Sequence, residues 1–270
     1  MPQQNPSVSA LLVDQDAHAK ILRIHNPERA NAVDEGILHA IVRELEDTPP
    51  GLRVVVLTGS GDRHFSAGLD LGDASGPELA ERLRRGEALL GTTTAAIAAC
   101  RCPVIGVING AAFGGALELA VACDWRIATD GARLGMPAVR LGVVYAPAGL
   151  ARFVALMGPA RTRQLFVGGR PVSAERAQAI GLVDEIVPAD TLEATVRQIA
   201  ADVAAAAPTA VAGTRAAIAL LSETIPATTV DEIERLRAAA YASPEFTEGL
   251  AAFRERRPPR WAASREEATG

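Results

Sequence analysis

The chain has 270 residues, 49% of them hydrophobic and 22% charged, which is enough to bury a substantial core as one domain with an appendage or as two small domains. Its formal net charge of −5 and its pI of about 5.5 exclude a broad basic surface, so we expect no nucleic-acid partner. No stretch reaches the roughly 18 uninterrupted apolar residues of a membrane span, and the N-terminus lacks the cationic segment of a signal peptide.

The N-terminal part of the chain predicts a hairpin, a helix and a buried strand. Apolar runs over residues 9–15 and 19–25 are separated by a short turn, which is typical of a β-hairpin. Asp34 then caps a helix that continues to about Glu46. Residues 53–59 are a continuous β-branched run, the pattern of a strand that is buried on both faces.

The middle of the chain alternates helices with strands. Residues 77–100 have helical periodicity, and residues 103–110 form a second buried strand. A helix begins at Gly114, and a third strand covers residues 125–129. Strand–helix alternation with short links predicts a layered α/β core with parallel strands.

The last part of the chain is helical throughout. We expect helices over residues 192–207, 208–222 and 231–242, followed by a charged tail that contains proline. The predicted organisation is therefore a core over residues 1–188 and a C-terminal helical region over residues 189–270.

Two glycine-containing loops leave strands at the same predicted edge of the sheet, where ligands of α/β proteins bind. Gly68 in "FSAGLD" permits a tight turn, and Gly114 and Gly115 in "NGAAFGGALE" permit close approach to the backbone. The first amides of a helix have no internal partner and carry the positive end of its dipole. An amide near Leu69 and the amide of Gly115 could therefore bind a developing oxyanion; alternatively, these glycines serve only as turns.

Glu118 lies one helical turn after Gly115, so it projects near the same face. Its apolar neighbours predict that the carboxylate is buried, with either a hydrogen-bonding partner or a raised pKa. One interpretation is a purely structural carboxylate. The other is acid–base or substrate-positioning chemistry beside the oxyanion site.

These elements, in this order, resemble the enoyl-CoA hydratase/isomerase (crotonase) superfamily over nearly the whole chain, from about Val8 to Trp261. The motifs that carry the resemblance are "NPERANAV", "FSAGLDL", "INGAAFGGALELAVACDWRIA" and "LFVGGRPVSAERAQAIGLVDEIVP". The resemblance implies a ClpP-like spiral of ββα turns, with C-terminal helices that form a homotrimer or a dimer of trimers. It also implies an acyl-CoA substrate, with coenzyme A entering as part of that substrate and no other bound cofactor.

The resemblance assigns roles to individual residues. The amides of Leu69 and Gly115 correspond to the oxyanion hole that holds the thioester oxygen. The positions that correspond to the substrate and coenzyme-A site are Arg29, Ala30, Ala67, Leu69, Asp70, Leu71, Gly72, Asp73, Met136 and Arg256. Arg256 matches a lysine that, in decarboxylase-like members, reaches the coenzyme-A phosphate from a neighbouring subunit.

One position departs from the pattern of the hydratases. Hydratases of this superfamily use two glutamates around a water, and the first of them corresponds to Glu118. The second, which is also the carboxylate of the Δ3,Δ2-isomerases, corresponds to Ala138. A single Glu118 can bind water but cannot supply a separate acid and a separate base.

A second departure lies at Tyr145, where hydratases usually have proline or glycine. The run "LGVVY" and the C-terminal "YASPEFTEGLAAFRERRPPRW" resemble methylmalonyl-CoA decarboxylases, although those enzymes have a histidine at the position of Leu69. The Tyr145 hydroxyl is expected to orient a substrate carboxylate or an enolate, or else the ring only shapes an acyl pocket. Glu118 and Tyr145 are thus the predicted catalytic residues.

The favoured interpretation is a decarboxylase-like lyase that stabilises an enolate oxyanion. The alternatives are an enoyl-CoA hydratase that uses Glu118 alone, and a non-catalytic acyl-CoA binder or RNA-associated relative. The cysteines match neither a zinc spacing nor a disulfide framework, and the histidines are scattered, so we expect no metal site and a cytoplasmic location.

Overall fold

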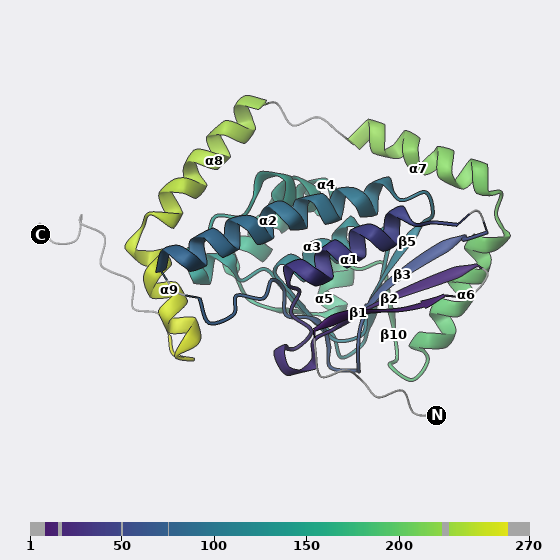
Figure 1. Cartoon of the computed structure of the whole chain (residues 1–270), viewed down its shortest axis with the longest axis horizontal. Helices are drawn as coiled ribbons and strands as arrows, with labels where there is room; N and C mark the ends of the chain where they lie inside the picture. The colour runs from purple at the N-terminus through teal and green to yellow at the C-terminus, as the bar shows by residue number, and fades with distance from the viewer. Residues whose placement is uncertain (1–8, 16–17, 50, 75, 223–226, 259–270) are drawn as a thin grey trace, which may run out of the picture.

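The chain is described by a computed structural model, which covers residues 9–15, 18–49, 51–74, 76–222 and 227–258. The architecture is α/β, as predicted. Two sheets form its centre, and helices cover both faces of the larger one (Figure 1).

The larger sheet has six strands among the described residues, in the order β1-β2-β3-β5-β7-β10. Strands β1 (Ala10–Gln15) and β2 (Ala19–His25) pair antiparallel and form the predicted hairpin. The remaining neighbours pair in parallel, which agrees with the prediction from strand–helix alternation. The other strands of this sheet are β3 (Val54–Gly59), β5 (Val104–Ile108), β7 (Trp125–Thr129) and β10 (Glu185–Val187).

A smaller sheet, which the sequence did not predict, has the order β4-β6-β8-β9. Its strands are β4 (His64–Ser66), β6 (Ala111–Phe113), β8 (Arg133–Gly135) and β9 (Val172–Ser173). Strands β4, β6 and β8 pair in parallel, and β9 pairs antiparallel to β8. These segments are too short to display an apolar period, so only their tertiary pairing identifies them.

The two sheets are linked by a repeated turn of the chain. From β3 to η2, each turn contributes one strand to the larger sheet, the next strand to the smaller sheet, and then a helix or helical turn. The turns β3–β4–α2 and β5–β6–α3 follow this rule, so successive turns stack beside one another. This is the predicted spiral of ββα turns, and it brings the ends of β4 and β6 together.

The α-helices pack around this spiral. Their bounds are α1 Glu35–Glu46, α2 Gly76–Ala99, α3 Gly115–Ala122, α4 Pro147–Gly168, α5 Ala174–Ala179, α6 Leu192–Ala205, α7 Pro208–Ser222, α8 Ala227–Tyr241 and α9 Pro244–Arg254. Two 3₁₀-helices, η1 (Pro27–Arg29) and η2 (Ala138–Leu141), lie in the loops. The Asp34 side chain accepts a hydrogen bond from the Ile37 amide, which confirms the predicted cap of α1.

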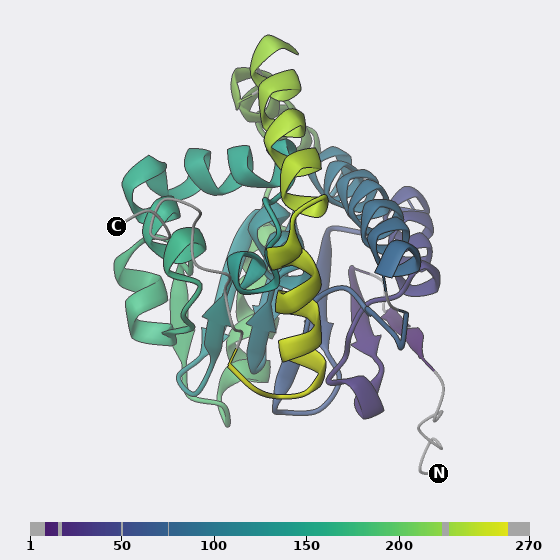
Figure 2. The same ribbon diagram turned by 90° about the vertical axis from the view of Figure 1, so that its left-hand side faces the viewer.

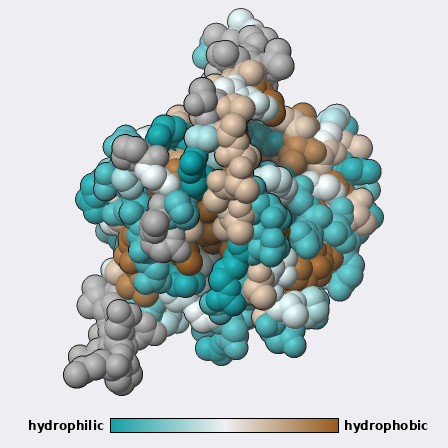
Figure 3. Space-filling view, turned by 90° about the vertical axis from the view of Figure 1, so that its right-hand side faces the viewer, coloured by the Kyte–Doolittle hydropathy of each residue, from teal (hydrophilic) through white to brown (hydrophobic). Residues whose placement is uncertain are grey.

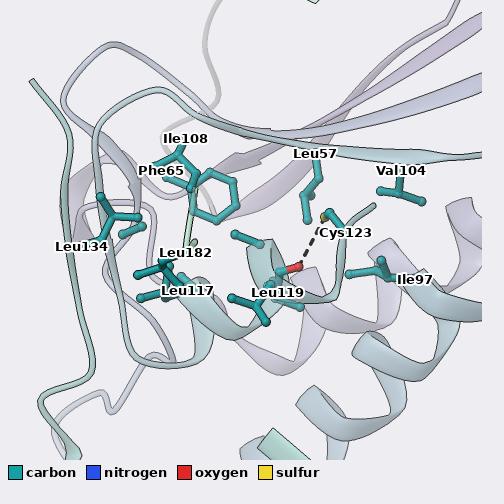
Figure 4. Close-up of a cluster of buried hydrophobic side chains, with 14 of the residues drawn as sticks. Leu57, Phe65, Ile97, Val104, Ile108, Leu117, Leu119, Cys123, Leu134 and Leu182 are labelled. Carbon is teal, nitrogen blue, oxygen red and sulfur yellow. Dashed lines mark hydrogen bonds between the residues drawn. The ribbon is translucent and has the colours of Figure 1, made fainter. Parts of the chain in front are cut away.

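The main core lies between the larger sheet and helices α1 to α4. Helix α3 is its centre, with every residue from Gly115 to Val121 buried. Figure 4 shows side chains of β3, β5 and α3 meeting in this core. The Cys123 thiol donates a hydrogen bond to the Leu119 carbonyl at 3.3 Å there, and burial raises the pKa of Cys123 to about 12, so this thiol is inert.

The C-terminal helices are distributed over different parts of the molecule. Helix α6 packs on the opposite face of the larger sheet, whereas α8 and α9 follow one another end to end, with α9 against η2 (Figure 2). The face seen in Figure 3 mixes hydrophilic surface with smaller apolar patches. The division into 1–188 and 189–270 stays a prediction. None of the helices in the described residues is long and apolar enough to cross a membrane.

Candidate functional site

The candidate site is built where β4 and β6 end side by side. The chain turns sharply after β4 at Gly68, whose φ is 100°. A Cβ at Gly68 would lie 2.7 Å from the Phe113 carbonyl oxygen and 3.4 Å from the Gly115 amide nitrogen. Only glycine fits this close approach, which brings the loop after β4 against the N-terminus of α3.

Two backbone amides in this contact are unpaired. The carbonyl of Gly68 and the amide of Asp70 both bond to Val33, but the Leu69 amide between them has no acceptor in the described residues. Gly115 is the first residue of α3, so its amide has no acceptor within the helix, and none is found elsewhere in the described part of the chain. Both residues border the same cavity, so their amides are the candidate donors to a ligand oxygen there.

The cavity has a volume of about 420 Å³ and is mostly apolar. Its walls come from the loop after β4, the N-terminus of α3, one turn of α2, the segment around η2, and α9. The lining residues are Arg29, Ala32, Ala67, Gly68, Leu69, Asp70, Leu71, Gly72, Leu83, Glu87, Phe113, Gly114, Gly115, Pro137, Ala138, Leu141, Val143, Tyr145 and Phe253.

Glu118 and Tyr145 form a buried pair beside the amides. The Tyr145 hydroxyl donates a hydrogen bond to Glu118 Oε2 at 2.6 Å, and the two residues are 9% and 3% exposed. Tyr145 borders the cavity, whereas Glu118 lies behind it and is not on the wall. Tyr145 is therefore the member of this pair that borders the cavity.

Both members of this pair have shifted pKa values. Burial raises the pKa of the Glu118 carboxyl, and the hydrogen bond from Tyr145 opposes that rise only in part. Burial, together with the charge of Glu118, raises the pKa of Tyr145 well above its usual range. Tyr145 thus keeps its proton, and the expectation that Glu118 has a partner or a raised pKa is met in both respects.

Comparison with known proteins identifies the fold and the class of chemistry. The enoyl-CoA hydratase/isomerase family matches residues 15–264. The chain belongs to this family. It is therefore an enzyme of the crotonase superfamily, and its substrates are coenzyme-A thioesters.

Individual members of the family differ in their reactions. The chain is 34% identical to a putative enoyl-CoA hydratase/isomerase of Bacillus subtilis (YngF), over 92% of this chain and 96% of that protein. A methylmalonyl-CoA decarboxylase in complex with 2-nitronate-propionyl-CoA superposes with a TM-score of 0.84 at 26% identity, covering 94% and 98% of the two chains. An enoyl-CoA hydratase of Bacillus anthracis superposes with a TM-score of 0.71 at 31% identity, covering 96% and 99%.

The residues predicted for coenzyme A fall into two groups within this family fold. Six of them line the cavity: Arg29, Ala67, Leu69, Asp70, Leu71 and Gly72. Of the others, Ala30 accepts a hydrogen bond from the Ala67 amide, and Asp73 is an exposed neighbour of Arg29. Met136 is fully buried in the core, away from the cavity wall. Their roles toward coenzyme A stay predictions.

Glu87 is the residue that the sequence analysis missed. It is on the cavity wall. On α2 it follows the buried Leu83 by four residues and precedes the buried Leu90 by three, so it shares their face of the helix. A glutamate on the buried stripe of an amphipathic helix is a signal that the sequence does contain. No group of histidine, cysteine, aspartate and glutamate that could hold a metal ion is found in the described residues.

Arg256 lies outside the cavity of its own chain. It is exposed, just after α9, in a left-handed conformation with φ of 53°. Its predicted contact with coenzyme-A phosphate is formed equally in the ground and transition states, so Arg256→Ala is expected to raise KM about tenfold and to leave kcat unchanged. The measurement is steady-state kinetics at low salt, with the exposed Arg254→Ala as the matched control. An unchanged KM in Arg256→Ala would remove this residue from the binding site.

Proposed function

We propose that this enzyme is a decarboxylase-like lyase that removes CO₂ from a malonyl-type coenzyme-A thioester. The observation that carries the proposal is the Tyr145–Glu118 pair, because the tyrosine rather than the carboxylate borders the cavity that the residues of the two free amides also line. Ala138, on the same wall, offers no acid or base at the position of the second hydratase glutamate. The similarity to methylmalonyl-CoA decarboxylase supports the same reaction.

The oxyanion site would stabilise the product of C–C cleavage. When the bond from the α-carbon to the carboxylate breaks, its electron pair enters the thioester as an enolate and CO₂ departs. The negative charge then lies on the thioester oxygen, which accepts hydrogen bonds from the amides of Leu69 and Gly115. The Gly115 amide is also at the positive end of α3, so both local bonds and the helix dipole favour this charge.

Tyr145 would orient the leaving carboxylate, and this requires a change of proton position. A tyrosine hydroxyl has one proton, and in this structure that proton is donated to Glu118. To donate to a substrate carboxylate instead, Tyr145 needs Glu118 in its protonated form, as a donor to the phenolic oxygen. Burial raises the pKa of Glu118, which favours this form.

Hydration of a 2-enoyl thioester is the second candidate. The curated relatives favour it, because proteins of similar length such as the 2,3-dehydroadipyl-CoA hydratase of Escherichia coli have this activity in their names. Against it stand Ala138 on the cavity wall and the position of Glu118 behind Tyr145.

Incubation of the wild-type protein with methylmalonyl-CoA and, separately, with crotonyl-CoA tests the two candidates. We expect release of propionyl-CoA from the first and only slow formation of 3-hydroxybutyryl-CoA from the second, because acid–base help is worth about a hundred- to ten-thousand-fold. Ala138→Glu is expected to raise the hydration rate. Hydration by wild type with kcat/KM above about 10⁶ M⁻¹s⁻¹, an efficient rate, and no CO₂ release would overturn the proposal.

Assembly and location belong to the same proposal. A homotrimer or a dimer of trimers, formed by the C-terminal helices, and a cytoplasmic location are typical of the enzymes that this chain resembles. The oligomeric state is measurable by light scattering on the purified protein.

A further inference from the structure

One turn of α2 packs directly over the two free amides. A Cβ at Gly86 would lie 3.2 Å from Cδ1 of Leu69, and a Cβ at Gly115 would lie 2.9 Å from Cδ2 of Leu90. Glu87 belongs to the same helical turn, between these two contacts, and it borders the cavity. Its carboxylate is therefore placed beside the oxyanion site.

The Glu87 carboxylate is held in place by two residues of α8. Arg237 Nη2 donates to its Oε2, and the Tyr241 hydroxyl lies 3.0 Å from each of its oxygens. The side chains of Glu87 and Arg237 are only 10% and 6% exposed. Arg237 Nη1 also donates to the Val144 carbonyl at 3.1 Å, which ties this group to the residue before Tyr145. A carboxylate has about four acceptor positions, so Glu87 can accept a further hydrogen bond from a ligand.

Glu87 and Ala138 line the same cavity. Ala138 and Tyr241 pack against the same hydrophobic cluster, and the Tyr241 hydroxyl extends from that cluster to Glu87. Burial raises the pKa of Glu87 more than its bonds to Arg237 and Tyr241 lower it, which favours uptake of a proton relative to an exposed glutamate. The pKa values of Glu118 and Tyr145 are raised chiefly by burial, and the nearby charge of Glu87 adds to the rise in both.

We propose that Glu87 is a catalytic residue that transfers a proton to and from the α-carbon of the bound acyl group. The inference rests on the proposed function in one respect, namely that the site stabilises an enolate. After CO₂ leaves, the enolate carbon forms a C–H bond with the proton of the Glu87 carboxyl, and the O–H bond breaks. Glu87 becomes a carboxylate held by Arg237 and Tyr241, and it regains a proton from water once the product leaves. In reverse, the carboxylate removes an α-proton from an acyl-CoA.

Deuterium exchange isolates this step from decarboxylation. Propionyl-CoA has no carboxylate to lose, so its α-protons exchange with D₂O only through enolate formation and proton transfer. We expect mass spectrometry to show deuterium entering propionyl-CoA with wild type, and Glu87→Gln to slow this exchange by about a hundredfold or more. Glu234→Gln is the matched control, because Glu234 pairs with the same Arg237 at 3.2 Å but is solvent-exposed and off the cavity wall. It is expected to exchange at the wild-type rate.

A second variant separates loss of the acid from loss of the fold. Glu87→Gln leaves the Arg237 charge buried opposite a neutral group, whereas Glu87→Gln with Arg237→Gln removes both members of the pair. The fold of the single and the double variant is checked by circular dichroism and by coenzyme-A affinity. The exchange rate of whichever variant is folded then tests the role of Glu87. Wild-type exchange in a folded variant, or no exchange in wild type, would overturn the role of Glu87. Failure of the proposed function has a different signature, namely exchange into propionyl-CoA without release of CO₂ from methylmalonyl-CoA.

Discussion

Replacing Gly115 by proline is expected to lower kcat by about a hundred- to a thousand-fold, the usual effect of losing one oxyanion-hole donor. Gly115 is the first residue of α3, a position where proline fits a helix because that amide has no partner within it. The substitution removes the backbone N–H of residue 115, which is the hydrogen-bond donor proposed for the thioester oxygen. The large effect is expected in kcat because the hydrogen bond strengthens as charge develops on the thioester oxygen.

The control for this variant is set by the packing around Gly115. Any side chain there meets Leu90, whose Cδ2 would lie 2.9 Å from the new Cβ. Leu90→Val removes the δ carbons, so both substitutions at position 115 are made in that background. Gly115→Ala then adds a Cβ but keeps the amide proton, whereas Gly115→Pro loses it. The comparison of proline with alanine at 115 therefore isolates the hydrogen bond. Equal kcat values for the two folded variants would remove Gly115 from the site.

The elements that the sequence predicted correctly are those with a strong local signal. Strands β3 and β5 are runs of buried, mostly apolar residues because both of their faces are covered, and Asp34 marks the start of α1 with its own side chain. Helix α4 was missed because Gly158, with φ of 77°, and Pro159 interrupt its pattern. In the C-terminal region, the prediction ended its last helix at residue 242 and did not include α9, which begins after a cap at Ser243.

The sequence predicts those features of the candidate site that depend on residues close together in the chain. Two free amides follow from the glycines and from the start of a helix, and burial of Glu118 follows from its apolar neighbours. The contact of Glu118 with Tyr145, 27 residues away, depends on tertiary packing. Glu87 is one of many charged residues on α2, and its bond to Tyr241, 154 residues later, is what distinguishes it. Sequence patterns carry no record of such pairings.

Tyr145→Phe is expected to slow CO₂ release by about a hundredfold or more and to leave acyl-CoA affinity nearly intact. The ring keeps its edge contact with Phe166, with centroids 5.4 Å apart, so the cavity wall is retained. Only the hydroxyl that orients the leaving carboxylate is lost. The measurements are kcat with methylmalonyl-CoA and the inhibition constant of propionyl-CoA, which reports affinity without the reacting carboxylate.

Glu118→Gln separates decarboxylation from hydration at the same pair. A glutamine amide donates to the Tyr145 oxygen as a protonated Glu118 would, so the tyrosine proton stays available for the substrate carboxylate. Decarboxylation is therefore expected to fall by less than about tenfold. Hydration, in contrast, needs Glu118 as a base for water and is expected to fall by about a hundredfold or more.

If Tyr145→Phe decarboxylates like wild type, Tyr145 is only a wall of the pocket, and the Glu118 carboxylate behind it has to carry the chemistry alone.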